Sequence, residues 1–199
     1  MDAAYEILNF LTENSIDDLH MLPVFNTDPY NVWGSLSQEE KDLIKTFPFK
    51  AYKIYLNREI ATTQTTNIFN YNGLNDKSDA FRHAFFQAIN ARDVGVQVAS
   101  LFGDAHESEV PLALLLEKNM DLFNNEIGYL NGFQNPDLSN SEMSNLIYTA
   151  LQSGDLRYLY PLDFVSSPLY DANGDGIQDC SNCLNGIISS TSLIPTNQP

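Results

Sequence analysis

Polar side chains with catalytic or metal-binding chemistry gather in the middle of the chain, and the first group begins at Asp79. The segment reads Asp-Ala-Phe-Arg-His-Ala, and on a helix Asp79, His83, Gln87 and Asn90 share one stripe, because residues three or four apart are neighbours. The surrounding residues are mostly apolar. The spacing therefore predicts a polar seam along an otherwise apolar helix.

Two further groups follow within fifty residues. His106 and Glu107 come at the expected end of a helix, where side chains from different segments can converge. The run from Met120 to Gly128 then places Asp121, Asn124 and Asn125 on one helical face with Gly128, which lacks a side chain and allows another helix to approach closely. We expect these groups to meet between packed helices.

The first chemistry that this set could perform depends on a metal ion. Imidazole and carboxylate groups are ordinary ligands of zinc, manganese or iron, and helical bundles build such sites from inward-facing side chains. A bound metal ion activates water near neutral pH and would allow hydrolysis of an ester, amide or phosphoester. The candidate ligands are Asp79, His83, His106, Glu107 and Asp121.

A metal-free site is an alternative. Asp121 or Glu107 would orient His83 or His106 as a general base, and a developing oxyanion would be stabilised by Arg82 or by the amides of Asn124 and Asn125. The chain has no G-x-S-x-G motif, and both cysteines lie far along the sequence, so acyl-enzyme chemistry is disfavoured. A third interpretation is purely structural, with the same groups satisfying one another in a buried network.

The three motifs together resemble an uncharacterised bacterial domain family. Its signature reads D-A-F-R-H-A, then A-H-E, then M-D-L-x-N-N-x-x-G, and here the motifs occur in order as 79–84, 105–107 and 120–128. The family often has aromatic-Trp-Asn after the first motif, where this chain has Phe85-Phe86-Gln87, and a basic residue after the last glycine, where it has Tyr129. The resemblance implies a shared fold and candidate positions, and no reaction.

A second kind of site is expected near the C-terminus. Residues 171–182 place oxygen-bearing side chains and one backbone carbonyl at the spacing that wraps a chain around calcium, with Gly176 at the sharp turn. The loop resembles those of thrombospondin type 3 repeats more than a helix-flanked EF-hand. It predicts a structural Ca²⁺, and the expected ligands are Asp171, Asn173, Asp175, Ile177, Asp179 and Asn182.

Composition narrows the partners and the location. The 26 acidic against 10 basic residues give a net charge of -16, which disfavours nucleic acid, and no apolar run is long enough to cross a bilayer. A small molecule, an ester or a basic surface fits better as a ligand. The calcium loop favours a secreted, periplasmic or cell-envelope protein whose signal peptide is absent from this sequence. Cys180 and Cys183 then form either a local disulfide or two free thiols.

The elements that must position these groups are mainly helices. Capping residues and apolar periodicity predict helices over 3–13, from 37 to before Pro48, and over 49–63, 76–92, 94–107, 110–130 and 140–151. Short strands are expected near 158–164. The chain is thus predicted to be a mainly α, single-domain bundle over 1–160, with the signature region at 76–132, a calcium-loop extension at 161–190 and a flexible tail at 191–199.

These expectations combine into one functional hypothesis. It describes a secreted or envelope-associated bacterial calcium-binding protein. A candidate hydrolytic site, working with or without a metal ion, is expected between its helices. The alternatives are a non-enzymatic extracellular binding or adhesion module, in which the polar network is structural, and a toxin-like effector domain.

Overall fold

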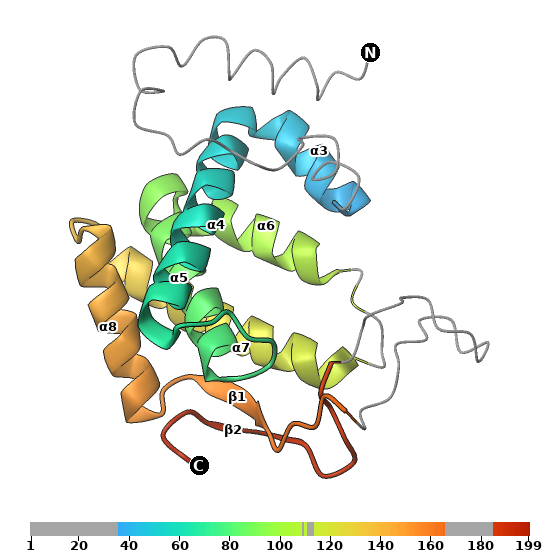
Figure 1. Cartoon of the computed structure of the whole chain (residues 1–199). Helices are drawn as coiled ribbons and strands as arrows, with labels where there is room; N and C mark the ends of the chain where they lie inside the picture. The colour runs from blue at the N-terminus through green and yellow to red at the C-terminus, as the bar shows by residue number, and fades with distance from the viewer. Residues whose placement is uncertain (1–35, 109, 111–113, 166–184) are drawn as a thin grey trace.

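The computed structural model describes residues 36–108, 110, 114–165 and 185–199. This part of the chain is mainly helical, as predicted, and its strands form a single two-stranded sheet. The helices are α3 (Gln38–Thr46), α4 (Pro48–Phe69), α5 (Lys77–Val94), α6 (Val96–Glu107), α7 (Leu115–Gln134) and α8 (Asn140–Ser153), and the strands are β1 (Arg157–Tyr160) and β2 (Ser192–Pro195) (Figure 1).

Local signals in the sequence set the helix ends. Ser37 and Ser139 each form a capping box with a glutamate three residues later, which satisfies free backbone N–H groups at the starts of α3 and α8. Pro48 separates α3 from α4 and occupies the first turn of α4. Gly154 ends α8 with a left-handed backbone at φ 82°.

Helix α5 is the central element of the fold. It packs against α4, α6, α7, α8 and β1, and 12 of its 18 residues are buried. Phe81, Phe85 and Ile89 are completely buried in the main core, together with Met120 of α7. Because the core surrounds α5, polar groups on this helix must find partners inside the protein.

The α5–α7 crossing is close because α7 presents two glycines to α5. A Cβ atom at Gly128 would lie 2.4 Å from the carbonyl oxygen of Ala84, and one at Gly132 would lie 2.2 Å from that of Ala88. The close approach predicted for Gly128 is therefore confirmed. It brings the polar stripes of the two helices into contact.

The C-terminal segment differs from its prediction as a flexible tail. Residues 192–195 form β2, which pairs antiparallel with β1 so that Leu193 lies opposite Leu159. Thr196 is buried and donates its hydroxyl to the Leu151 carbonyl at 2.5 Å. These stabilising partners lie more than thirty residues upstream, which is why the local composition of the tail did not reveal them.

Most predicted helices are confirmed, with longer ends for α4 and a later start for α7. No helix in the described part of the chain is long and apolar enough to cross a membrane. The helix predicted at 3–13 lies outside the described residues, as do both cysteines and the calcium ligands Asp171, Asn173, Asp175, Ile177, Asp179 and Asn182.

Candidate metal centre

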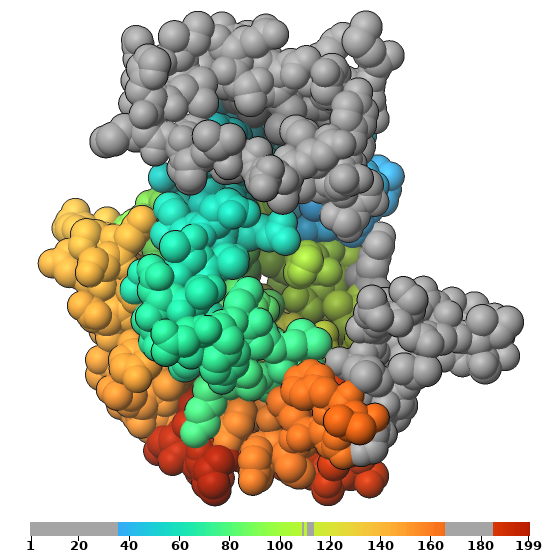
Figure 2. Space-filling model, viewed as in Figure 1, coloured from blue at the N-terminus to red at the C-terminus, as the bar shows by residue number. Residues whose placement is uncertain are grey.

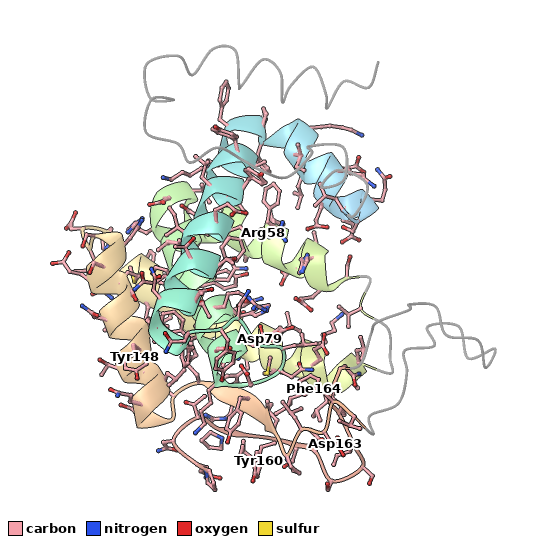
Figure 3. The ribbon with its side chains drawn as sticks, in the orientation of Figure 1. Arg58, Asp79, Tyr148, Tyr160, Asp163 and Phe164 are labelled. Atoms are coloured by element: carbon pink, nitrogen blue, oxygen red, sulfur yellow. The ribbon has the colours of Figure 1, made fainter. Side chains whose placement is uncertain are left out.

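Two of the candidate ligands come from the first turns of α5. The side chain of Asp76 caps this helix by accepting hydrogen bonds from the backbone N–H groups of Ser78 and Asp79. Asp79 lies in the interior at this end of α5 (Figure 3), with 1% of the residue exposed. One turn later, the Nε2 atom of His83 lies 3.5 Å from Asp79 Oδ1.

The third candidate ligand comes from α7. Asp121 Oδ1 lies 3.4 Å from His83 Nε2, and the two side chains are 11% and 18% exposed. One ligand atom from each of Asp79, His83 and Asp121 falls within 4.8 Å of the other two. Among the described residues this is the only such group of three His, Cys, Asp or Glu side chains. We call it the Asp-His-Asp cluster.

The protonation state of His83 favours metal binding. Burial lowers the pKa of His83, and this effect outweighs the opposing attraction of Asp79, so the ring is neutral near pH 7. His83 Nδ1 lies 3.3 Å from the side-chain oxygen of Asn125. An amide oxygen accepts hydrogen bonds, so Nδ1 carries the proton and Nε2 presents its lone pair to the two carboxylates.

Negative charge accumulates around the cluster. Burial, followed by repulsion from Asp79, Glu107 and Glu117, raises the pKa of Asp121 well above its usual range. Burial also raises the pKa of Glu107 and of Glu117. Asp121 Oδ1 is a buried atom that accepts no hydrogen bond from the described residues. A cation between these groups would satisfy that oxygen and relieve the repulsion.

Arg82 supports Asp79 and is tied to the loop before α5. Its guanidinium donates to Asp79 Oδ1, to the side chain of Asn72 and, at 3.1 Å, to the carbonyl of Gly73. A carboxylate oxygen has two lone pairs, so the bond from Arg82 leaves Asp79 Oδ1 able to bind a cation as well.

His106 does not join the cluster. Its side chain is 67% exposed, and its Nδ1 atom lies 3.2 Å from Glu40 Oε1 of α3. The hydrogen bond with Glu40 raises the pKa of His106 and outweighs the opposite effects of burial and of Arg58, which extends from α4 toward α6 (Figure 3). His106 therefore links α6 to α3. On the face drawn in Figure 2 the surface is hollowed between α4 and α6.

Of the other predicted residues, Glu107 and Asn125 lie near the cluster, whereas Asn124 has its partners elsewhere. Glu107 is 3% exposed, and its charge acts on Asp121, so it lies beside the cluster without belonging to it. Asn124 is completely buried and uses both ends of its amide on the backbone of Arg157, at 2.8 and 2.9 Å. Asn124 therefore holds β1 against α7, whereas Asn125 contacts His83.

Sequence reasoning missed Asn75 and Glu117. Asn75 has a left-handed backbone at φ 65° and donates its N–H to Asp79 Oδ2 at 2.6 Å, while its side chain donates to Glu117 at 3.0 Å. Asn is among the few residues that tolerate this conformation, and its place just before the helix cap was the available signal. Glu117 in the first turn of α7 resembled an ordinary acidic helix start.

The fold and the cluster together define an all-α domain with a buried Asp-His-Asp group where two helices cross. The chain belongs to the family described as "Domain of unknown function (DUF6973)", which matches residues 41–155. The matched span includes Asp79, His83 and Asp121, and membership in an uncharacterised domain family agrees with the prediction from the sequence. Comparisons with curated proteins and with solved structures gave no match.

Proposed function

We propose that the chain binds one divalent transition-metal ion at Asp79, His83 and Asp121 and uses it for hydrolysis. The observation that carries this proposal is the environment of Asp121 Oδ1, which is buried, accepts no hydrogen bond from the described residues and lies 3.4 Å from the Nε2 atom of a neutral histidine. A purely structural network would be expected to supply a hydrogen-bond donor to this buried oxygen.

The ligand set limits the choice of metal. Two carboxylates and one imidazole suit zinc, manganese or iron, and three protein ligands leave positions for water and substrate. Asn125 would fix the ring of His83, as partners of metal-binding histidines commonly do. Arg82 would hold Asp79 in place while leaving a lone pair for the ion.

A metal ion supplies Lewis acidity and an activated water molecule. The protein would supply proton transfer, because Glu107 is buried beside the cluster and has a raised pKa, which brings its titration closer to neutral pH. The partial exposure of His83 and Asp121, 18% and 11%, supports access for a small substrate. We infer an ester, amide or phosphoester as the bond that is cleaved.

The calcium loop forms a second proposal, which is supported by its sequence spacing. We infer that residues 171–182 bind Ca²⁺ in a structural role and that the protein acts outside the cytoplasm, where calcium is abundant. This proposal is independent of the Asp-His-Asp cluster.

The test of the transition-metal site compares two histidines. The wild-type protein, His83→Ala and His106→Ala are stripped of metal, incubated with Zn²⁺ or Mn²⁺, and measured for bound metal by elemental analysis. We expect one ion per chain in the wild type and in His106→Ala, and none in His83→Ala. Hydrolysis of chromogenic carboxylic and phosphoric esters is then compared before and after loading. Equal metal content in the wild type and His83→Ala would contradict the proposed site.

A further inference from the structure

Asn75 holds an unusual backbone conformation next to the candidate metal centre. It is completely buried, and Asn75 and Asn70 are the residues other than glycine that have a positive φ in the described part of the chain, at 65° and 63°. This conformation costs free energy for most side chains and is best tolerated by Gly and Asn. Surrounding contacts must therefore stabilise it.

The backbone of Asn75 makes two of these contacts. Its N–H donates to Asp79 Oδ2 at 2.6 Å, and its carbonyl oxygen accepts from the N–H of Leu159 in β1 at 2.9 Å. The first bond occupies one carboxylate oxygen of Asp79. The other oxygen, Oδ1, is then directed toward His83, at 3.5 Å from Nε2.

The side chain of Asn75 makes the remaining contacts. Its Nδ2 group donates to Glu117 Oε2 at 3.0 Å and to the backbone carbonyl of Asn185 at 2.8 Å. These partners belong to α7 and to the C-terminal segment that continues into β2. One amide therefore connects the start of α5, the start of α7 and the C-terminal segment.

We infer that Asn75 is a positioning residue for the metal centre and, through Asn185, makes metal affinity depend on the C-terminal segment. This inference rests on the proposed function. The side-chain bonds fix the Asn75 backbone so that its N–H orients the Asp79 carboxylate, and the same amide holds Glu117 close to the cluster. Partners of metal ligands contribute roughly 10- to 100-fold to metal affinity in other proteins.

The test uses a pair of matched substitutions. Asn75→Gly keeps the left-handed backbone and its N–H but removes the amide, whereas Asn70→Gly makes the same change at an exposed residue that ends α4. Both variants and the wild type are titrated with Co²⁺, and the visible absorption bands report affinity and geometry. We expect Asn75→Gly to bind about 10-fold more weakly with altered bands, and Asn70→Gly to match the wild type.

Each outcome has a distinct meaning. Wild-type affinity and bands in Asn75→Gly would overturn the inference and leave the metal site intact, whereas absence of Co²⁺ binding by the wild type would overturn the proposed function itself. If Asn75→Gly does not fold, hydrogen exchange of the Asn75 backbone amide is measured in the wild type with and without Zn²⁺. Slower exchange with Zn²⁺ supports the inference, and unchanged exchange contradicts it.

Discussion

The Nε2 atom of His83 on α5 lies 3.4 Å from the Oδ1 atom of Asp121 on α7, and this oxygen accepts no hydrogen bond from the described residues. Two acceptors face each other when His83 is neutral with its proton on Nδ1 and Asp121 is ionised. Such a pair costs free energy unless a proton or a metal cation lies between them.

Replacing Asp121 should have opposite effects without and with metal. Asp121→Asn removes a buried charge that burial and neighbouring carboxylates disfavour, so the metal-free variant should melt at a higher temperature than the metal-free wild type at pH 7. Added Zn²⁺ or Mn²⁺ should stabilise the wild type and have little effect on the variant. Thermal melting with and without metal measures both effects.

The pH dependence of the metal-free wild type provides a check on this explanation. Because the pKa of Asp121 is raised by folding, the folded chain binds the extra proton, and stability should fall as pH rises from the ordinary Asp value of 3.8 to the raised folded value. The stability of Asp121→Asn should not show the part of this decrease that comes from deprotonation of Asp121. Identical pH profiles for the two proteins would contradict the assignment.

The neighbouring asparagines of α7 should behave differently. Asn124→Ala breaks two hydrogen bonds to the Arg157 backbone and should lower the free energy of unfolding by about 1–3 kcal/mol, with metal affinity unchanged in the folded protein. Asn125→Ala removes the partner of His83 Nδ1 and should weaken metal binding about 10-fold. Denaturant unfolding and calorimetric metal titration separate the effects. Equal metal affinities in the two variants would argue against a role for Asn125.

Gly128→Ala tests whether the close helix crossing positions the site. The added methyl group would meet the Ala84 carbonyl oxygen at 2.4 Å, so α7 must move, and we expect a loss of about 1–3 kcal/mol in the free energy of unfolding together with weaker metal binding. Glu126→Ala, at an exposed position of the same helix, is the control. A Gly128→Ala protein as stable as this control would show that the crossing tolerates the extra atom.

The contact between α3 and α6 should depend on pH. The hydrogen bond to Glu40 raises the pKa of His106. The contribution of His106 to the free energy of unfolding is therefore complete below about pH 6.5 and is lost as pH rises through the raised pKa. Burial raises the pKa of Glu40, but hydrogen bonds from His106 and Ser37 outweigh it and lower the net value, so its contribution is complete above 4.5 and is lost at lower pH.

The linkage is therefore strongest between pH 4.5 and 6.5. His106→Gln should narrow the difference in melting temperature between pH 5.5 and pH 8.5. The effect should be small, about 1 kcal/mol or less, because the histidine is exposed. If the difference in melting temperature measured for the wild type is unchanged in His106→Gln, other groups cause it.

The calcium prediction is tested apart from the transition-metal site. Added Ca²⁺ should raise the melting temperature of chelator-treated wild type and of His83→Ala, and should not do so in Asp175→Ala, which lacks a central loop ligand. A wild-type melting temperature that does not respond to Ca²⁺ would reject ion binding at residues 171–182.

Features with short-range causes were accessible from the sequence. Periodicity placed Asp79 and His83 on one stripe of α5, and Gly128 correctly indicated a close crossing with another helix. The capping box at Ser37 and the stop at Gly154 were likewise local signals. The signal for each of these features is the identity or spacing of residues within one helix or at its ends.

Features with long-range causes were not accessible. His106 contacts Glu40, which lies 66 residues away, and the side chain of Asn75 donates to the carbonyl of Asn185, which lies 110 residues away. Asn124 and Asn125 have the same side chain and adjacent positions, yet one contacts Arg157 and the other His83. Tertiary packing decided between them.

The glycine contacts between α5 and α7 limit the size of the ion that the proposed site can accept. Sliding α7 along α5 by one turn, about 5.4 Å, would bring a side chain against the Ala84 or Ala88 carbonyl, where the structure has room only for Gly128 and Gly132. The backbones that carry Asp79 and Asp121 therefore keep a fixed separation, and only side-chain rotation can adapt the gap. A small ion that tolerates short ligand distances should be preferred there over a large one such as Ca²⁺.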